Sequence, residues 1–359
     1  MKNPALPFAG LCLLALTACA GPVTLAPQGS SLEIRQETER EKEIAYKRII
    51  EDQDLVFNVS FPILAANAGF CGDKTAPSFG MTAWNLESVR PEYHQAVASL
   101  YNLHARLAVQ HVAPRSPAAR AGIHSGDFIV AINGTDIPHG DKARKTADEA
   151  LRQGGYRQAD ILLERNGSLI NASVQPVTAC NYPVVLDSES NDINAFTDGK
   201  RILLSKGILH FAENNNEVAL VIAHELGHLA MHHIDKQREN AMVGTIGGLA
   251  IDSLLAAAGV NSGGQVGQLG QELGARRFSI AFEQEADYVG MYFMERAGYN
   301  SSFVADFWRR AAAEMPKSVS MGADHPTTPE RFLAIERTHR EIALKKSRRE
   351  ELVPNFQQK

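Results

Sequence analysis

The segment NNNEVALVIAHELGHLAMHHID, residues 214–235, constrains the fold more than any other part of the chain. Its apolar residues recur at helical spacing, which predicts a buried or half-buried helix. On such a helix His224 and His228 project from one side and can bind the same metal ion. Glu225 lies about 100° further round, where it reaches a water on that ion rather than the ion. The pattern predicts a zinc site with Glu225 as general base; an ordinary helix with two satisfied histidines is the alternative.

A catalytic zinc ion takes three protein ligands and keeps one position open, so a further ligand is needed. The extended histidine motif that would place Gly at 231 and His at 234 is excluded, because the chain has Met231 and Ile234. Three successive turns of one helix rarely reach one small ion. We therefore interpret His232 and His233 as residues that support the ligands or the fold, and expect the third ligand on another helix.

The hexapeptide FEQEAD, residues 282–287, supplies the candidates for that ligand. Glu283 and Asp287 are four residues apart and share a helix face, whereas Glu285 lies about 200° from Glu283. A metal-bound imidazole usually donates its other N–H to a carboxylate. We therefore expect Glu283 on the zinc and Asp287 behind a histidine. Glu285 is expected to face solvent or the two arginines of the preceding RRFSIAF.

Four spaced elements between about residues 180 and 340 together resemble the gluzincin metallopeptidase family of CAAX prenyl proteases, HtpX heat-shock proteases and BepA-type proteases. These elements are INAFTDG with ILLSKGIL, HELGH, EQEAD and HPTTPERF. The resemblance implies one zinc ion per chain, held by His224, His228 and Glu283. It also implies peptide-bond hydrolysis, with Glu225 as the catalytic base.

The outer elements of this resemblance add expectations about substrate and reaction. Asn194, Ala195 and Phe196 would line the substrate cleft, on an edge strand that presents the substrate in extended form. HPTTPERF would place His325 and Arg331 near the zinc. His325 would either stabilise the oxyanion of the intermediate or occupy the fourth zinc position and hold the enzyme inactive; a structural role is the third interpretation.

The N-terminus carries the pattern of an exported protein. Residues 1–18 contain an apolar run that is too short to span a membrane and ends in small residues, as a secretory signal does. LTAC resembles a bacterial lipobox, which implies that Cys19 is lipidated and that residues 19–30 form a tether. Ala20 resembles the signal for sorting to the outer membrane. We expect a lipid anchor on the periplasmic face of that membrane; an uncleaved anchor or an ordinary signal is the alternative.

Export also bears on the remaining cysteines. Cys12 lies in the signal and Cys19 would carry lipid, which leaves Cys71 and Cys180 as one pair. In an oxidising compartment we expect these two to form a disulfide. Two free buried thiols are the alternative.

The middle of the chain contains a second resemblance. Residues 31–104 read as a helical and extended region, in which a charged helix precedes a strand-like VFNVSFPIL. Residues 105–178 resemble a bacterial PDZ domain, whose signature is a run like SPAARAGIHSGDFIVAINGT, and include a hairpin turning at Asn166-Gly167. PDZ domains bind extended peptides or C-termini by adding a strand to a sheet edge. A structural spacer without a ligand is the alternative.

These boundaries give an α+β architecture. A β-rich PDZ-like domain precedes a mostly helical zincin metallopeptidase domain with a small β-sheet, residues 179–345, and a tail follows at 346–359. Within the metallopeptidase domain, AMVGTIGGLAIDSLLAAAGV is apolar but interrupted by Asp252 and several glycines. We expect residues 241–260 to form a helix or lid over the cleft; membrane insertion is the alternative.

Charge and composition narrow the function. The net charge of -5 gives no indication of nucleic-acid binding. We predict a zinc-dependent endopeptidase that acts on unfolded or misassembled envelope proteins, in protein quality control. A chaperone or assembly factor that recruits partners through its PDZ domain, with little or gated proteolysis, is the second hypothesis. A structural zinc protein is the third.

Overall fold

The structure is a computed structural model that describes residues 24, 26–257, 265–314 and 328–357. The described helices are α1 (Ser31–Ala66), α2 (His94–Tyr101), α3 (Pro117–Arg120), α4 (Ala143–Gln153), α5 (Lys206–Phe211), α6 (Asn215–Ala230), α7 (His233–Ala257), α8 (Gln265–Arg296), α9 (Val304–Glu314) and α10 (Pro329–Ser347). The strands are β1 (Thr75–Ser78), β2 (Met81–Trp84), β3 (Ala108–Val112), β4 (Phe128–Ile132), β5 (Thr135–Asp136), β6 (Ala159–Arg165), β7 (Ser168–Val174), β8 (Val177–Cys180), β9 (Val184–Asp187), β10 (Ala195–Thr197) and β11 (Ile202–Ser205). Short 3₁₀ turns are η1 (Ala68–Phe70), η2 (Leu86–Ser88), η3 (Pro91–Tyr93) and η4 (Gly140–Lys142).

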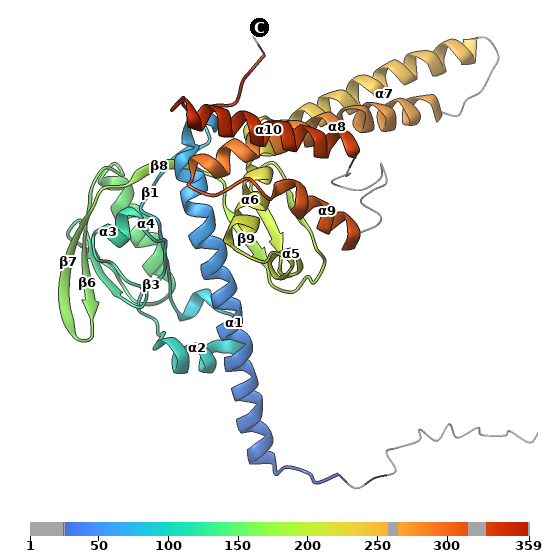
Figure 1. Cartoon of the computed structure of the whole chain (residues 1–359). Coiled ribbons are helices and arrows are strands. Elements are labelled where there is room, and N and C mark those ends of the chain that lie inside the picture. Colours follow the sequence, from blue (N-terminus) through green and yellow to red (C-terminus); the bar gives the residue numbers. More distant parts are fainter. Residues whose placement is uncertain (1–23, 25, 258–264, 315–327, 358–359) are drawn as a thin grey trace, which may run out of the picture.

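Helix α1 runs between the β-rich part of the chain and the C-terminal helical part (Figure 1). Ser30 begins it with a capping box to Glu33, which satisfies backbone donors of the first turn. The strand predicted for VFNVSFPIL is wrong, because these residues continue the helix. Val56, Val59 and Ile63 are buried at helical spacing in the C-terminal core. Packing against two neighbours outweighs the local β preference here.

The β-rich part has the elements of the predicted PDZ-like domain. Its six-stranded sheet has the order β2-β3-β4-β6-β7, with β5 paired to β4. Strands β6 and β7 form the predicted hairpin, and Asn166 and Gly167 both have positive φ at the turn. Because β2 belongs to this sheet, the sheet begins before residue 105. Helices α3 and α4 complete a separate apolar core.

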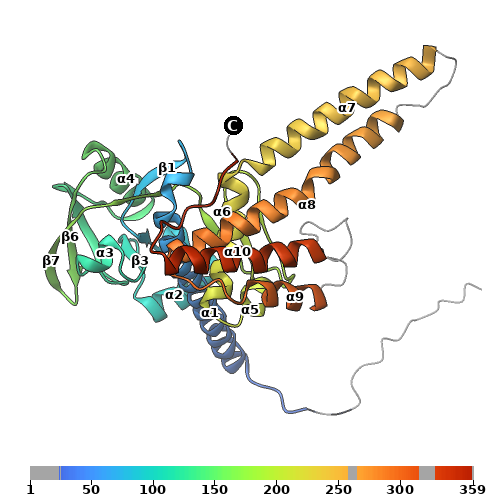
Figure 2. The same cartoon turned by 45° about the horizontal axis from the view of Figure 1, so that its top comes forward.

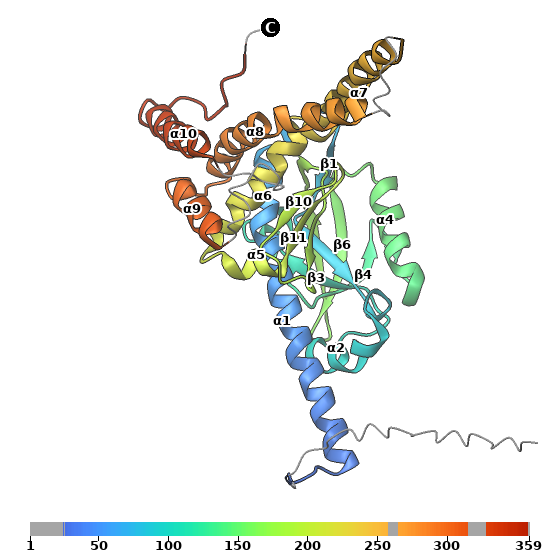
Figure 3. The ribbon, with the colours of Figure 1, turned by 90° about the vertical axis from the view of Figure 1, so that its right-hand side faces the viewer.

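The C-terminal part is mostly helical around one small sheet, so the predicted α+β class is confirmed. The sheet has the order β10-β11-β9, in which β10 and β11 form an antiparallel hairpin and β9 lies parallel to β11. Helix α6 contacts β10 (Figure 3) and is buried along almost its whole length. This burial explains its apolar sequence. Residues after α10 pack back on the helices, since Arg296 donates to the Leu352 carbonyl.

The connection between the two parts is reinforced covalently. Strands β1 and β8 pair antiparallel, with Thr75 opposite Cys180. A disulfide joins Cys180 to Cys71, and both cysteines are buried in the C-terminal core. The bridge closes a loop that contains the whole PDZ-like sheet, because the two residues are 109 positions apart.

Helices α7 and α8 pack along each other and project from the body as a long arm (Figure 1, Figure 2). The helix expected over residues 241–260 is present as far as Ala257, but α7 leads away from the core rather than over a cleft; residues 258–260 lie outside the described residues. Among the described helices, none combines the length and the hydrophobicity of a membrane span.

We predict that Cys180→Ser lowers the free energy of unfolding by roughly 2–5 kcal/mol, because the unfolded chain gains the freedom of a large loop. Chemical unfolding of the oxidised wild type and the variant measures the difference. A reductant should lower the stability of the wild type by a similar amount and leave the variant unchanged. Equal stability of the oxidised wild type and the variant would show that the Cys71–Cys180 disulfide does not stabilise the folded chain.

Candidate metal centre

Helices α6 and α8 approach at backbone distance where the two sequence motifs lie. A Cβ atom added to Gly227 on α6 would lie 3.0 Å from the Ala286 carbonyl oxygen on α8. A Cβ added to Gly290 would lie 3.0 Å from the backbone nitrogen of His224. Both glycines therefore allow a spacing that alanine would widen. The close contact brings FEQEAD beside the HELGH turn.

Three buried donors converge between these helices. The Nε2 atoms of His224 and His228 are 3.1 Å apart, and they lie 3.3 and 3.2 Å from the two carboxylate oxygens of Glu283. Donors placed tetrahedrally at ~2.0–2.1 Å from one zinc ion are themselves about 3.3–3.4 Å apart. The three residues thus fit a zinc ion by donor type and by spacing. All three were predicted as ligands from the sequence.

Asp287 and Arg331 support one side of this donor set. The Asp287 carboxylate lies 3.0 Å from His224 Nδ1, and Arg331 Nη2 donates to the same carboxylate over 2.9 Å. Arg331 Nη1 lies 3.3 Å from Glu283, and its guanidinium stacks 4.6 Å from the Trp308 ring. Burial raises the pKa of Asp287, but the charge and hydrogen bonds of Arg331 and His224 outweigh it and lower that pKa overall. The carboxylate is therefore held ionised.

A second hydrogen-bonded chain supports His228. Its Nδ1 lies 3.0 Å from Nδ1 of His233, and Nε2 of His233 lies 2.8 Å from Glu285. The His233 ring also stacks on Phe282, with centroids 4.6 Å apart. Glu285 was expected to face solvent or an arginine; its side chain is 42% exposed, but it also pairs with His233, a partner that the sequence did not predict. The hydrogen bond from His233 lowers the pKa of Glu285.

His232 has a different role from His233. It is exposed and has a φ of 56°, at the turn between α6 and α7. This turn redirects the chain so that His233 comes back toward His228. The sequence grouped the two histidines together, but only the geometry separates the one that contacts a ligand from the one that shapes the turn.

Glu225 is buried beside the donors, with an exposed fraction of 2%. Burial lowers the pKa of Arg331, but the negative charges of Asp287, Glu283 and Glu225 outweigh it and raise that pKa. The Glu225 carboxylate is thus one of the three negative charges that act on the Arg331 guanidinium. Glu225 follows the ligand candidate His224 directly in sequence but is not one of the three grouped metal donors.

The residues predicted for the substrate cleft lie at the edge of the small sheet. Strand β10 pairs with β11 and stands at one end of the described three-stranded sheet. Phe196 is 46% exposed, whereas Ala195 is buried. Asn194 precedes the strand, and its carbonyl accepts from the Ser205 hydroxyl. Two predicted site residues, Cys19 and His325, lie outside the described residues.

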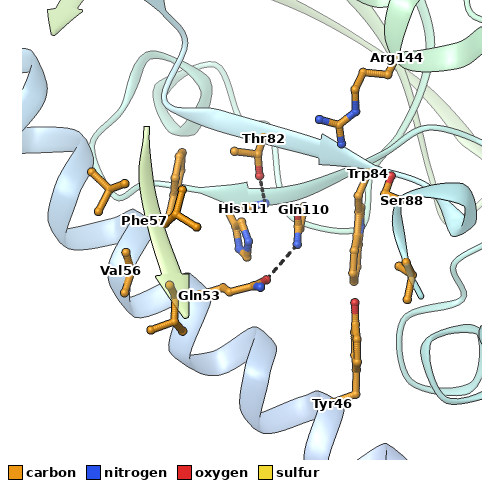
Figure 4. Close-up of a pocket in the computed structure, with 14 residues that line it drawn as sticks. Tyr46, Gln53, Val56, Phe57, Thr82, Trp84, Ser88, Gln110, His111 and Arg144 are labelled. Carbon is orange, nitrogen blue, oxygen red and sulfur yellow. Dashed lines mark hydrogen bonds between the residues drawn. The ribbon is translucent and has the colours of Figure 1, made fainter. Parts of the chain in front are cut away.

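A separate cavity of about 350 Å³ lies between α1, the β2–β3 pair and β9 (Figure 4). Gln53 on α1 hydrogen-bonds Gln110 on β3, and the His111 backbone donates to Thr82. The His111 ring contacts the Asp54 carboxylate. This cavity has walls from both parts of the chain. Its lining residues come from distant segments, so no sequence pattern predicted it.

Comparisons with known proteins match the two parts separately. The family model described as Peptidase family M48 matches residues 162–339, and the model described as PDZ domain matches residues 109–165. Metalloprotease LoiP of Escherichia coli is 32% identical over 162 residues, which are 45% of this chain and 62% of that protein. The beta-barrel assembly-enhancing protease of Yersinia pestis is 27% identical over 185 residues, 48% of this chain and 38% of that protein.

Similarity extends to a mitochondrial protein. The mitochondrial metalloendopeptidase OMA1 of Schizosaccharomyces pombe is 30% identical over 149 residues, which are 40% of this chain and 42% of that protein. In each of these three relatives, the match covers less than two thirds of the relative's own length.

We predict that Arg331→Met lowers the free energy of unfolding by about 3–5 kcal/mol in the presence of a metal chelator, because buried carboxylates lose their counter-charge. Arg309→Met is the matched control. Its guanidinium pairs with Asp306 and Glu336 but is 47% exposed, so the loss should stay below about 1 kcal/mol. Equal losses in the two variants would show that Arg331 does not balance the site.

Proposed function

We propose that this chain, whose residues 162–339 belong to peptidase family M48, is a zinc-dependent endopeptidase. The members of that family are zinc-dependent metalloproteases. The observation that carries the proposal is the convergence of His224, His228 and Glu283, with donor atoms 3.1–3.3 Å apart. Both histidines are buried and presented by one helix, so little reorganisation is needed to bind an ion.

Glu225 is the proposed catalytic base. When bound, zinc acts as a Lewis acid and lowers the pKa of a coordinated water. Glu225 then accepts a proton on its carboxylate and later passes it to the leaving amine. It follows His224 directly in α6, so its carboxylate lies beside the donors but turns about 100° away from them.

The proposed roles of the supporting residues follow from their contacts. Asp287 orients the His224 ring through Nδ1, and Arg331 holds Asp287 and Glu283 in place. His233 orients the His228 ring in the same way and is itself held by Glu285. Such supporting hydrogen bonds fix the tautomer and the direction of a metal-binding imidazole.

Strand β10 is the proposed platform for the substrate backbone. It is an edge strand that contacts α6, the helix with both histidines. An extended peptide that adds to this edge would lie along the donor set, with Phe196 available to contact a substrate side chain. Asn194 and Ala195 would line the same cleft.

The proposed setting is the bacterial envelope. The lipobox-like LTAC and the signal-like residues 1–18 support lipidation at Cys19 and attachment to the periplasmic face of the outer membrane. The names of two relatives, a metalloprotease and a beta-barrel assembly-enhancing protease, are consistent with substrates among unfolded or misassembled envelope proteins. Peptides or C-termini are the proposed ligands of the PDZ domain, whose sheet ends in the edge strand β2.

We predict that Glu225→Gln lowers the rate of cleavage of an unfolded substrate such as casein by about 10²–10⁴-fold, because the amide cannot accept the proton. Bound zinc should be unchanged, because Glu225 is not a donor. Glu239→Gln is the control: the same chemical change, on an exposed residue of α7, should leave the cleavage rate as it was.

Two outcomes would count against this assignment. Full cleavage by Glu225→Gln would exclude Glu225 as the base. Full complementation of a deletion strain by a cleavage-deficient Glu225→Gln chain would favour the chaperone or assembly role instead, with peptide hydrolysis dispensable.

A further inference from the structure

Helix α7 exposes an unusual concentration of large apolar side chains where the arm leaves the body. Five of the fifteen such side chains exposed in the described part of the chain fall between residues 242 and 251. They are Met242 (58% exposed), Val243 (67%), Ile246 (62%), Leu249 (50%) and Ile251 (50%). Single exposed apolar residues are common on soluble proteins, but a cluster on a projecting element marks an interaction surface.

These side chains span about 200° of the helix circumference, which is wider than a single stripe. At about 100° per residue, Met242, Ile246 and Leu249 share a side of α7. Val243 lies about a quarter turn away, and Ile251 lies on the opposite side from Met242. Helix α8 covers only part of this circumference. A folded protein partner would cover one further face, whereas a lipid environment can surround the arm.

Polarity also changes along the arm rather than across it. At its root, Asp235, Lys236, Arg238 and Glu239 are exposed charged residues. From residue 241 to the end of α7 at Ala257 the sequence contains a single charged residue, Asp252, and that side chain is buried. The charged and uncharged parts of α7 thus follow each other along the helix axis. This order is expected of a helix that extends from water into a lipid surface.

We propose that α7 is a membrane-docking element, whose uncharged part from residue 241 to Ala257 enters the interfacial region of a lipid bilayer. Both α7 and α8 join the same body at one end of the arm (Figure 1), so the arm would enter the bilayer from one side. The seventeen residues from 241 to the end of α7 reach about 25 Å, which suffices for one leaflet. Docking does not require peptidase activity, but it would set the distance between the metal centre and the bilayer.

The arm is continuous with the candidate metal centre. Helix α7 begins at His233, which contacts His228, and α8 carries Glu283 on its way back into the body. A docked arm would therefore hold the site within reach of the bilayer surface. Polypeptide segments that emerge from a membrane, or fail to enter it, are the substrate class that this placement favours.

Vesicle flotation tests the proposal. The probe is a vesicle of phosphatidylethanolamine and phosphatidylglycerol, and the protein is the chain from residue 19 with Cys19→Ser, so that no acyl chain contributes. We expect the double variant Val243→Glu, Ile246→Glu to lower vesicle binding at least tenfold. The control is Ile44→Glu, Leu169→Glu, whose residues are 63% and 64% exposed on α1 and β7, and its binding should change less than twofold.

A second measurement separates insertion from a folding defect. An environment-sensitive dye attached at Ile246→Cys should shift to shorter wavelength on adding vesicles, whereas the same dye at Leu169→Cys should not. The proposal would be overturned if the Cys19→Ser chain did not bind vesicles. It would also be overturned if the Val243→Glu, Ile246→Glu variant bound them as well as that chain does. It would also be overturned if the arm variant only dissociated an oligomer in solution, since a second copy would then cover the arm.

Discussion

Gly227 and Gly290 let α6 and α8 meet at backbone distance, and the geometry of the candidate metal centre depends on that contact. Neither helix holds a complete donor set: α6 brings two imidazoles and α8 brings one carboxylate. Side chains reach one ion only when the helix axes are close enough, and a Cβ at either glycine would separate them. The fold therefore fixes the donors through packing rather than through a flexible loop.

The same contact buries several carboxylates, and helix α10 supplies the positive charge that compensates them. Glu225, Glu283 and Asp287 are all buried between the helices, which is costly for carboxylates without partners. Arg331 on α10 contributes the positive charge and is itself fully buried. Its ion pairs with Glu283 and Asp287 connect α10 to α8. In the described part of HPTTPERF, Arg331 is therefore the residue that contacts the site.

Sequence spacing predicted the parts of this site that depend on one helix at a time. The four-residue separations of His224 and His228, and of Glu283 and Asp287, place each pair on one face whatever the tertiary structure. Spacing also placed Glu285 on another face but could not say what lies there. That face meets His233, which depends on the turn at His232. The helix over VFNVSFPIL was missed for a similar reason, because burial against two partners decides it.

Zinc content tests the central claim most directly, because binding requires both the correct donor residues and the close contact of α6 with α8. Metal analysis of the purified chain after dialysis should find one zinc ion per wild-type molecule. Glu283→Ala should lose the ion, whereas Glu285→Ala should retain it at moderate chelator concentration, since Glu285 acts only through His233. Retention by Glu283→Ala together with loss by Glu285→Ala would contradict the account.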